Sequence, residues 1–134
     1  MADRGVALRL KKLIEANQSL ATVESCEELL PRLIVLAQEV TAAEAASFLP
    51  YDPVRAVLEF ALACNEVLGT SVGEVLKSNI ELRLGEGIGG WAAANRHSLR
   101  IDDTANDSRF NRRADQCTGF LTRSILCVPV VYGD

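Results

Sequence analysis

The residues whose spacing most clearly suggests chemistry are three glycines in the stretch GEGIGGW (85–91). Gly85, Gly87 and Gly90 match the pattern G-x-G-x-x-G, with the apolar run IELRL before them and the helix-forming run IGGWAAANR after them. A glycine turn between a strand and a helix lets a phosphate approach the N–H groups at the helix N-terminus. The first hypothesis is therefore a dinucleotide-binding turn.

The rest of the chain argues against that hypothesis. A dinucleotide-binding unit needs alternating strands and helices, and an acidic residue about 20 positions beyond the glycines. Asp102 and Asp103 come only 12 and 13 residues after Gly90, and 44 residues follow the motif. We therefore expect the glycines to shape a sharp turn and to let another group approach the backbone closely.

Composition narrows the class of protein. The 134 residues are 49% hydrophobic and 24% charged, with a net charge of −4, which predicts one soluble globular domain. There is no basic run, no apolar run near the roughly 20 residues of a membrane span, and no signal-peptide core in MADRGVALRLKKL. We expect a cytoplasmic protein that contacts neither nucleic acid nor membrane directly.

The metal-binding side chains are few and scattered. Cys26, Cys64, Cys117 and Cys127 form no C-x-x-C pair, and His97 is the single histidine. Zinc sites need such ligands in close spacing, so no metal site is predicted, and the cysteines are expected to be reduced and partly buried.

The first half of the chain predicts two helices and a hairpin. Residues 4–20 look helical, and the spacing of Val6, Leu10, Leu13, Asn17 and Leu20 fits either a coiled-coil seam or a helix packed on its own domain. Ser25 and Glu28 form a capping box that starts a second helix, which Pro31 either kinks or delays. Residues 45–51 and 57–64 predict an antiparallel hairpin, with Pro50 at an edge or a bulge.

The second half predicts strands that alternate with short helices. Residues 65–79 are expected to be a loop with one helical turn, and 112–119 a helical turn. Strands are predicted at 80–84, 98–101 and 124–132, and the last is apolar on both faces and so expected to be central. This order predicts an α+β sandwich with a mostly antiparallel sheet.

Residues 84–130 resemble the central part of a GAF domain. The shared motifs are the Gly-x-Gly-Ile-x-Gly turn, NDSRF at 106–110 and TGFLTRSILCVP at 118–129. The resemblance covers 25–134 and leaves 1–24 as a signalling or dimerisation helix. It implies a PAS-like antiparallel sheet, with N-terminal helices on one face and short helices and loops roofing a pocket on the other. It also implies one further strand and a C-terminal helix beyond residue 134.

The resemblance implies a regulatory domain of a signal-transduction protein. Such domains bind a small molecule, of which a cyclic nucleotide is one candidate. They form homodimers through N-terminal helices and control an output domain such as a kinase, a cyclase or a transcription activator. A ligand-free dimerisation module is the alternative. A third hypothesis is an enzyme that reduces free methionine sulfoxide, but Ile88 stands where a cysteine would be needed, so we expect no enzyme.

The resemblance to the cyclic-nucleotide-binding branch implies nine ligand-binding residues. Backbone N–H groups at 88–90 would hold a phosphate, threonine hydroxyls a ribose or phosphate, and an asparagine amide a purine edge. In the alternative interpretation the same residues only cap turns and satisfy the local backbone. The nine are Ser47, Cys64, Asn65, Ile88, Gly89, Asn111, Asp115, Thr118 and Thr122.

Three further side chains near these motifs are given structural roles. Arg109 could pair with Asp102, Asp103 or Asp107 and so fix the loop. Phe110 is expected in the core, and Trp91 is expected to pack under the short helix.

Overall fold

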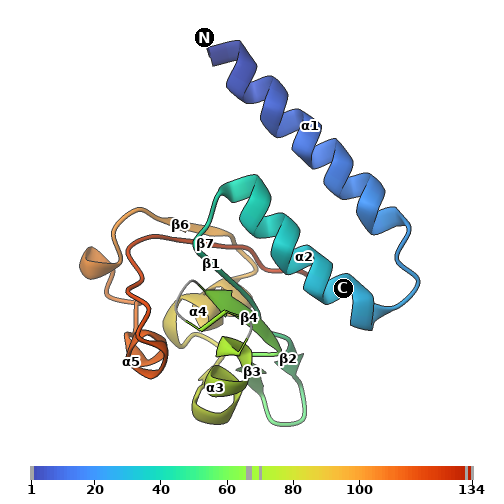
Figure 1. Ribbon diagram of the computed structural model, residues 1–134. Helices are drawn as coiled ribbons and strands as arrows, with labels where there is room; N and C mark the ends of the chain where they lie inside the picture. The colour runs from blue at the N-terminus through green and yellow to red at the C-terminus, as the bar shows by residue number, and fades with distance from the viewer. Residues whose placement is uncertain (1, 66–67, 70, 132, 134) are drawn as a thin grey trace.

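A hairpin of two helices lies on a body of short strands and helices (Figure 1). The computed structural model describes residues 2–65, 68–69, 71–131 and 133. The elements are α1 (Ala2–Ala21), α2 (Cys26–Thr41), β1 (Ala45–Phe48), β2 (Tyr51–Asp52), β3 (Val57–Glu59), β4 (Leu62–Asn65), α3 (Val72–Asn79), β5 (Glu81–Arg83), α4 (Gly87–Asn95), β6 (Leu99–Ile101), the 3-10 helix η1 (Thr104–Asn106), α5 (Arg113–Thr118) and β7 (Ile125–Cys127).

The predicted capping box starts the second helix. The Glu28 N–H donates to the Ser25 hydroxyl at 3.3 Å, and α2 begins at the next residue, Cys26. Pro31 lies inside α2, which continues to Thr41, so the proline does not delay the start. α2 packs on β1 and β4, which places it over one side of the hairpin (Figure 1).

The first helix packs on α2, and the N-terminal part of the predicted seam stays exposed. Ala16 is buried, whereas Val6, Leu10 and Leu13 are 55%, 54% and 51% exposed. Figure 1 shows the N-terminal part of α1 projecting beyond the body. Val6, Leu10 and Leu13 of the predicted seam thus keep more than half of their surface exposed, whereas Leu20 is partly buried.

The predicted hairpin is present as two ladders with a break. β1 pairs with β4, and β2 pairs with β3, all antiparallel. Between the ladders the Ala61 N–H donates to the Phe48 carbonyl at 3.1 Å and the Glu59 N–H to the Pro50 carbonyl at 3.2 Å. The sequence predicts an edge position or a bulge at Pro50, because proline has no N–H to donate, and the interruption between the two ladders lies at this residue. β5 then pairs with the other edge of β3, which gives the order β2-β3-β5.

The prediction of a long central strand at 124–132 is wrong for 124–131, and Tyr132 lies outside the described residues. β7 spans only Ile125–Cys127 and pairs with β6 alone among the described strands. Pro129 has no N–H to donate to a ladder, which limits extension on that side. Leu126, Val128 and Val130 are 62%, 59% and 83% exposed, so one apolar face of this segment is open.

The prediction of a loop with one turn at 65–79 is also wrong in part. α3 is a helix of 8 residues, although two glycines lower the helix propensity of this stretch. Leu76 and Ile80 are 5% and 3% exposed and belong to the core with Phe60 and Ala63. Burial of these side chains outweighs the propensity cost. Residues 66, 67 and 70 lie outside the described residues.

The fold is α+β with short antiparallel strands, as the sequence predicted. α2 lies on one side of β1 and β4, and α3, α4 and α5 lie on the other (Figure 1). Among the described helices, none combines the length and the apolar content that crossing a membrane requires.

Candidate ligand-binding cavity

A large cavity lies between the β1–β4 ladder, α4 and the segment that carries α5 and β7. Its volume is about 1560 Å³, which exceeds the roughly 300–1,000 Å³ of a typical small-molecule pocket. Side chains and backbone of both β1 and β7 line it, yet these strands do not pair with each other. The cavity therefore includes an open space between two unpaired strand edges.

All nine residues implied by the resemblance line this cavity. They come from four separate parts of the chain: β1, β4, the start of α4, and the stretch from Asn111 to Thr122. Only the tertiary fold brings these parts together. Each of the nine contributes atoms to the lining, although the Cys64 thiol is directed to Gln38 on α2. What the nine residues bind remains a prediction.

The glycine turn is built by backbone geometry that side chains would obstruct. Gly85 and Gly87 have φ values of +86° and +64°, in the left-handed region that favours glycine. A Cβ on Gly90 would lie 2.2 Å from the Arg83 carbonyl oxygen, so no other residue fits there. The Gly90 N–H donates to the Glu86 carbonyl at 3.1 Å, so it is not free for a phosphate as the sequence suggested.

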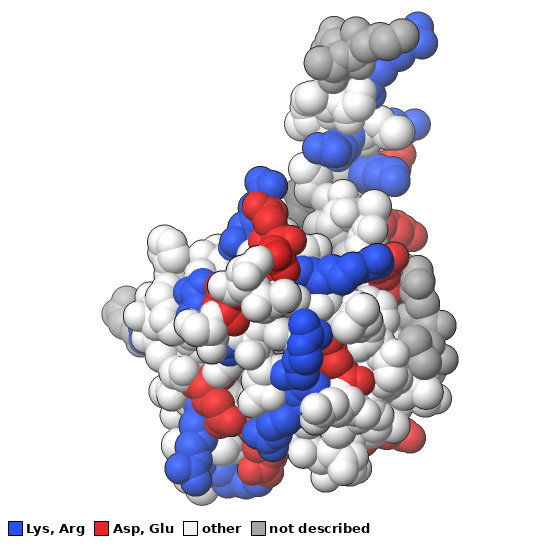
Figure 2. Space-filling model, turned by 90° about the vertical axis from the view of Figure 1, so that its left-hand side faces the viewer, with Lys and Arg blue, Asp and Glu red and all other residues white. Residues whose placement is uncertain are grey.

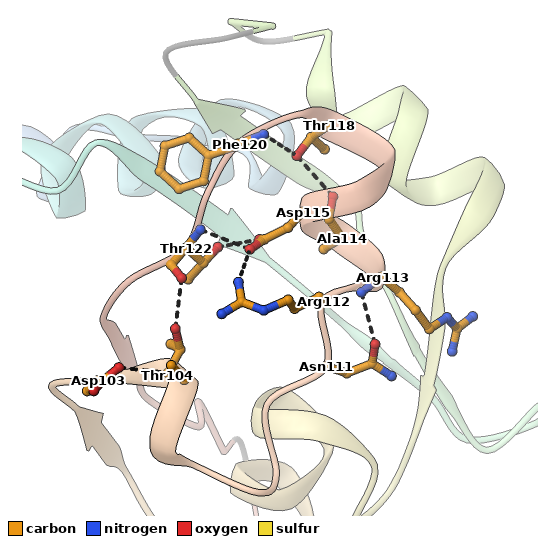
Figure 3. Close-up of polar contacts among 11 residues, drawn as sticks. Asp103, Thr104, Asn111, Arg112, Arg113, Ala114, Asp115, Thr118, Phe120 and Thr122 are labelled. Carbon is orange, nitrogen blue, oxygen red and sulfur yellow. Dashed lines mark hydrogen bonds and ion pairs between the residues drawn. The ribbon is translucent and has the colours of Figure 1, made fainter.

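A polar network ties the roof of the cavity together (Figure 3). The Thr122 hydroxyl donates to Asp115 Oδ1 at 2.6 Å, and the Thr122 N–H donates to Asp115 Oδ2 at 3.0 Å. Arg112 donates to the same Oδ2 atom at 3.4 Å. The carboxylate is therefore satisfied by the protein, and a ligand can reach the Thr122 hydroxyl only by sharing or replacing these bonds.

Thr104 belongs to this network and was missed by sequence reasoning. It is 3% exposed, and its hydroxyl donates to the Thr122 carbonyl at 2.8 Å. Its N–H donates to the Arg123 carbonyl at 2.9 Å. The partners lie 18 and 19 positions away in the chain, and no local pattern marks such a contact.

Several other predicted site residues also have partners within the protein. The Thr118 hydroxyl donates to the Ala114 carbonyl at 2.9 Å and accepts from the Phe120 N–H at 3.2 Å. The Asn111 side-chain oxygen accepts from the Arg113 N–H at 2.9 Å, as in a turn cap.

The two predicted residues of β4 show the same behaviour. The Asn65 side-chain oxygen accepts from the Leu68 N–H at 2.8 Å, and the Cys64 thiol donates to Gln38 Oε1 at 2.8 Å. These contacts fit the alternative interpretation, in which the nine residues have structural roles within the protein. They also define the bonds that a ligand would have to exchange.

Several charged side chains around the cavity form ion pairs. Arg123 pairs with Glu44 at 3.1 Å, Arg113 with Glu86 at 3.2 Å, and Arg112 with Asp115. Figure 2 shows basic and acidic side chains interleaved on one face of the body. Such a surface offers no extended basic patch on this face for nucleic acid.

One thiol near the cavity is held in its protonated form, and no metal cluster is found among the described residues. Burial raises the pKa of the Cys127 thiol, which favours the unreactive protonated form. Within the described residues, no group of three or more His, Cys, Asp or Glu side chains gathers where it could hold a metal ion.

The NDSRF motif resolves a choice that the sequence left open. Of the three candidate aspartates, Asp107 pairs with Arg109, at 2.6 Å between Oδ2 and Nη2. This hydrogen-bonded pairing lowers the pKa of Asp107 to about 2. Phe110 lines the cavity, and Trp91 lies on α4 beneath the Arg109 guanidinium.

Similar proteins include cyclic-nucleotide enzymes and GAF domains of known structure. A probable 3',5'-cyclic phosphodiesterase, pde-5, of Caenorhabditis elegans is 26% identical over 112 residues, which are 81% of this chain and 15% of that protein. The chain thus spans about one seventh of the length of this relative.

Two solved structures share the fold. The GAF domain of a phosphoenolpyruvate-protein phosphotransferase from Coxiella burnetii superposes with a TM-score of 0.75 at 19% identity, covering 92% of this chain and 70% of that one. The free methionine-R-sulfoxide reductase of Neisseria meningitidis, in complex with its substrate, gives 0.71 at 17% identity, covering 94% and 66%. The GAF domain model matches residues 25–134, and the chain belongs to the GAF domain family.

Proposed function

We propose that this GAF domain is a regulatory module that binds a small molecule in the cavity and controls an output domain outside these residues. The observation that carries the proposal is the convergence of nine side chains or backbone groups, from four parts of the chain, on one cavity. A cyclic nucleotide is the first candidate, because a relative is a probable 3',5'-cyclic phosphodiesterase. The module would work in the cytoplasm, where its thiols stay reduced.

In this proposal each part of the cavity has a role toward the ligand. The Asn65 amide would read the base, the N–H groups of Ile88 and Gly89 would approach the phosphate, and the threonine hydroxyls would bind ribose or phosphate. Binding at Thr122 must share or replace its bonds to Asp115. Ligand binding would therefore rearrange the roof, close residues 103–122 over the sheet and shift the N-terminal helices.

Thermal unfolding against a panel of compounds tests the proposal. The panel contains cyclic AMP, cyclic GMP, amino acids and 2-oxo acids. A compound that binds only the folded state at a hundred times its Kd stabilises it by about 2.7 kcal/mol. The shift in Tm should disappear in Thr122→Ala. It should persist in Thr22→Ala, whose hydroxyl donates to the Ser19 carbonyl between the first two helices.

The outcomes separate the alternatives. A shift that survives Thr122→Ala would contradict the placement of the ligand. Unchanged hydrogen exchange across 103–122 with a bound cyclic nucleotide would contradict roof closure. No shift with any compound would favour a ligand-free module.

That second candidate function, a dimerisation and signal-transmission module, is favoured by one observation. Val6, Leu10, Leu13 and Ile14 are 51–56% exposed on α1, which extends over about 30 Å. A second copy that packs against this stripe would remove it from water. Light scattering should show a dimer that weakens at least tenfold in Leu10→Glu and is unchanged in Gln18→Glu, which changes an exposed polar residue of the same helix.

The domain boundaries are part of the proposal. We infer that 25–134 is the GAF domain, that 1–24 lies outside it, and that the sheet takes a further strand along β1 and β7. Support comes from the edges of these two strands, which no described strand pairs. A chain of residues 25–134 should fold as a monomer. Amide exchange at Leu126 should be fast, and slow exchange would mean that the edge is already paired.

We also propose that the module is not itself an enzyme. Ile88 occupies the glycine turn, and the Cys127 thiol is held protonated by burial. A free methionine-R-sulfoxide reductase has a similar fold, so free methionine sulfoxide is the substrate to test. The chain should show no turnover of free methionine sulfoxide with a dithiol reductant, and measurable turnover would overturn this part of the proposal.

A further inference from the structure

The segment Asp107–Asn111 faces two directions. Phe110 and Asn111 line the cavity, as do Ile88 and Ala92 on α4. Arg109, which directly precedes Phe110, does not line the cavity, and its guanidinium carbon lies 4.8 Å from the centre of the Trp91 ring on α4. One short segment thus forms the cavity wall on one side and contacts α4 on the other.

Arg109 is held in this position from the opposite side as well. Its N–H and its Nε each donate to Asp107 Oδ1 at 2.9 Å, and Nη2 donates to Oδ2 at 2.6 Å. The guanidinium is therefore fixed by a two-pronged carboxylate contact while its face lies on an indole. The Trp91 ring in turn meets the edge of His97, with ring centres 6.4 Å apart.

We propose that Asp107, Arg109 and Trp91 form a clamp that fixes the roof loop to α4 and thereby positions Phe110 and Asn111 in the cavity wall. Arg109 is the positioning residue: it does not line the cavity, and it acts through its neighbour Phe110. The inference rests on the proposed function and deepens it, because the clamp would couple ligand binding in the cavity to the position of α4.

The clamp requires arginine rather than any cation. A guanidinium is planar, so it can donate two parallel hydrogen bonds to a carboxylate and stack on an aromatic face at once. Lysine keeps the charge but offers a point donor on a flexible stem. Arg109→Lys therefore removes the geometry of the clamp without changing the net charge.

The single tryptophan of the chain reports on the clamp directly. In Arg109→Lys we expect the Trp91 emission maximum and its acrylamide quenching to change. Amide exchange across 107–111 should be about threefold faster, the size expected for the loss of one exposed cation–π contact. The matched control is Arg55→Lys. Arg55 pairs with Glu59 and Glu81, and it does not line the cavity.

A second variant separates the clamp from a general loss of stability. Trp91→Leu should accelerate exchange across 107–111 by a similar factor, and Trp91→Phe, which retains an aromatic face, should restore most of the protection. The double variant Trp91→Leu with Arg109→Lys should add little, because both changes break the same contact. Equal exchange in all variants and the wild type would overturn the proposal, as would full additivity.

A ligand measurement keeps this inference distinct from the proposed function. If cyclic GMP raises the Tm of the wild type, the shift should be smaller in Arg109→Lys and unchanged in Arg55→Lys. An identical shift in Arg109→Lys would contradict coupling to the cavity. If cyclic GMP and the rest of the panel give no shift in the wild type, the proposed function fails, while the exchange and fluorescence results still decide whether the clamp exists.

Discussion

A central region, residues 84–123, differs from two outer segments, α1 and residues 125–131, in how many of its side chains have partners within the chain. From Leu84 to Arg123 the polar side chains are joined by a dense set of hydrogen bonds and ion pairs, including those of Asp107 and Asp115. α1 and the stretch from β7 to Val131 instead expose apolar side chains, such as Leu10 at 54% and Val130 at 83%. The centre is specified by contacts within the chain, whereas the outer segments expose apolar surface of the kind found at interaction sites.

The largest effect is expected in the centre, at the glycine turn. Gly90→Ala would place a Cβ 2.2 Å from the Arg83 carbonyl oxygen, which is backbone and cannot move aside. Overpacking of this kind should lower the free energy of unfolding by about 3 kcal/mol or prevent folding. Chemical denaturation measures the change.

The neighbouring glycine provides the control for that substitution. A Cβ on Gly89 would lie 3.4 Å from Leu82 Cδ1, the end of a side chain that can adjust. Gly89→Ala should therefore change stability by less than about 1 kcal/mol, partly because alanine favours the helix. Equal losses for the two variants would mean that the close approach at Gly90 does not determine the turn.

The roof network should give the next largest effect. Asp115→Ala leaves the Thr122 N–H and hydroxyl without their acceptor, and it should lower the free energy of unfolding by about 2 kcal/mol. Thr122→Val removes only the hydroxyl and should cost less. A double-mutant cycle by urea denaturation should show coupling between the two positions, and strict additivity would contradict a shared network.

The outer segment should respond in the opposite way. Leu126 is 62% exposed, so Leu126→Lys should change stability by only about 0.5 kcal/mol and reduce self-association, since a charge protects an open strand edge. Ile125 faces the other side and is half-buried, so Ile125→Lys should destabilise the fold. Light scattering and denaturation on both variants would show whether the two faces of β7 differ as the structure requires.

The smallest effect is a pH dependence of the clamp. The hydrogen bonds from the Arg109 side chain and then its backbone lower the pKa of Asp107 from 3.8 to about 2. The stabilisation is therefore complete above pH 4 and is lost as the pH falls through about 2. The stability difference between the wild type and Asp107→Asn should be constant from pH 7 to 4 and shrink below that. A difference that already falls between pH 6 and 5 would contradict this assignment.

Much of the fold follows from local sequence patterns. The Ser25 capping box starts α2, Pro50 marks the break in the hairpin, and the glycine motif separates β5 from α4. These patterns work because each rests on the chemistry of one or two neighbouring residues. The helix α3 was underestimated, because Gly73 lowers its propensity while Leu76 and Ile80 gain burial that only the assembled core provides.

For the candidate site, the sequence proposed the residues and did not predict the hydrogen bonds among them. The family resemblance indicated nine residues that the structure places around one cavity. It did not indicate that Asp115 already holds Thr122, or that Thr104 reaches Thr122 from another loop. Such contacts join positions 7 and 18 apart, and sequence spacing in loops does not fix which groups meet.

The sequence by itself determined the class of fold, the family, and the positions of the capped helix, the hairpin and the glycine turn, because these depend on local propensities and on motifs with fixed spacing. Only the tertiary structure decided that β7 is a short strand with one open edge, that Arg109 chooses Asp107 and Trp91, and which apolar residues of α1 stay exposed. The reason is physical: burial and partner choice are properties of surfaces that exist only once distant segments have packed.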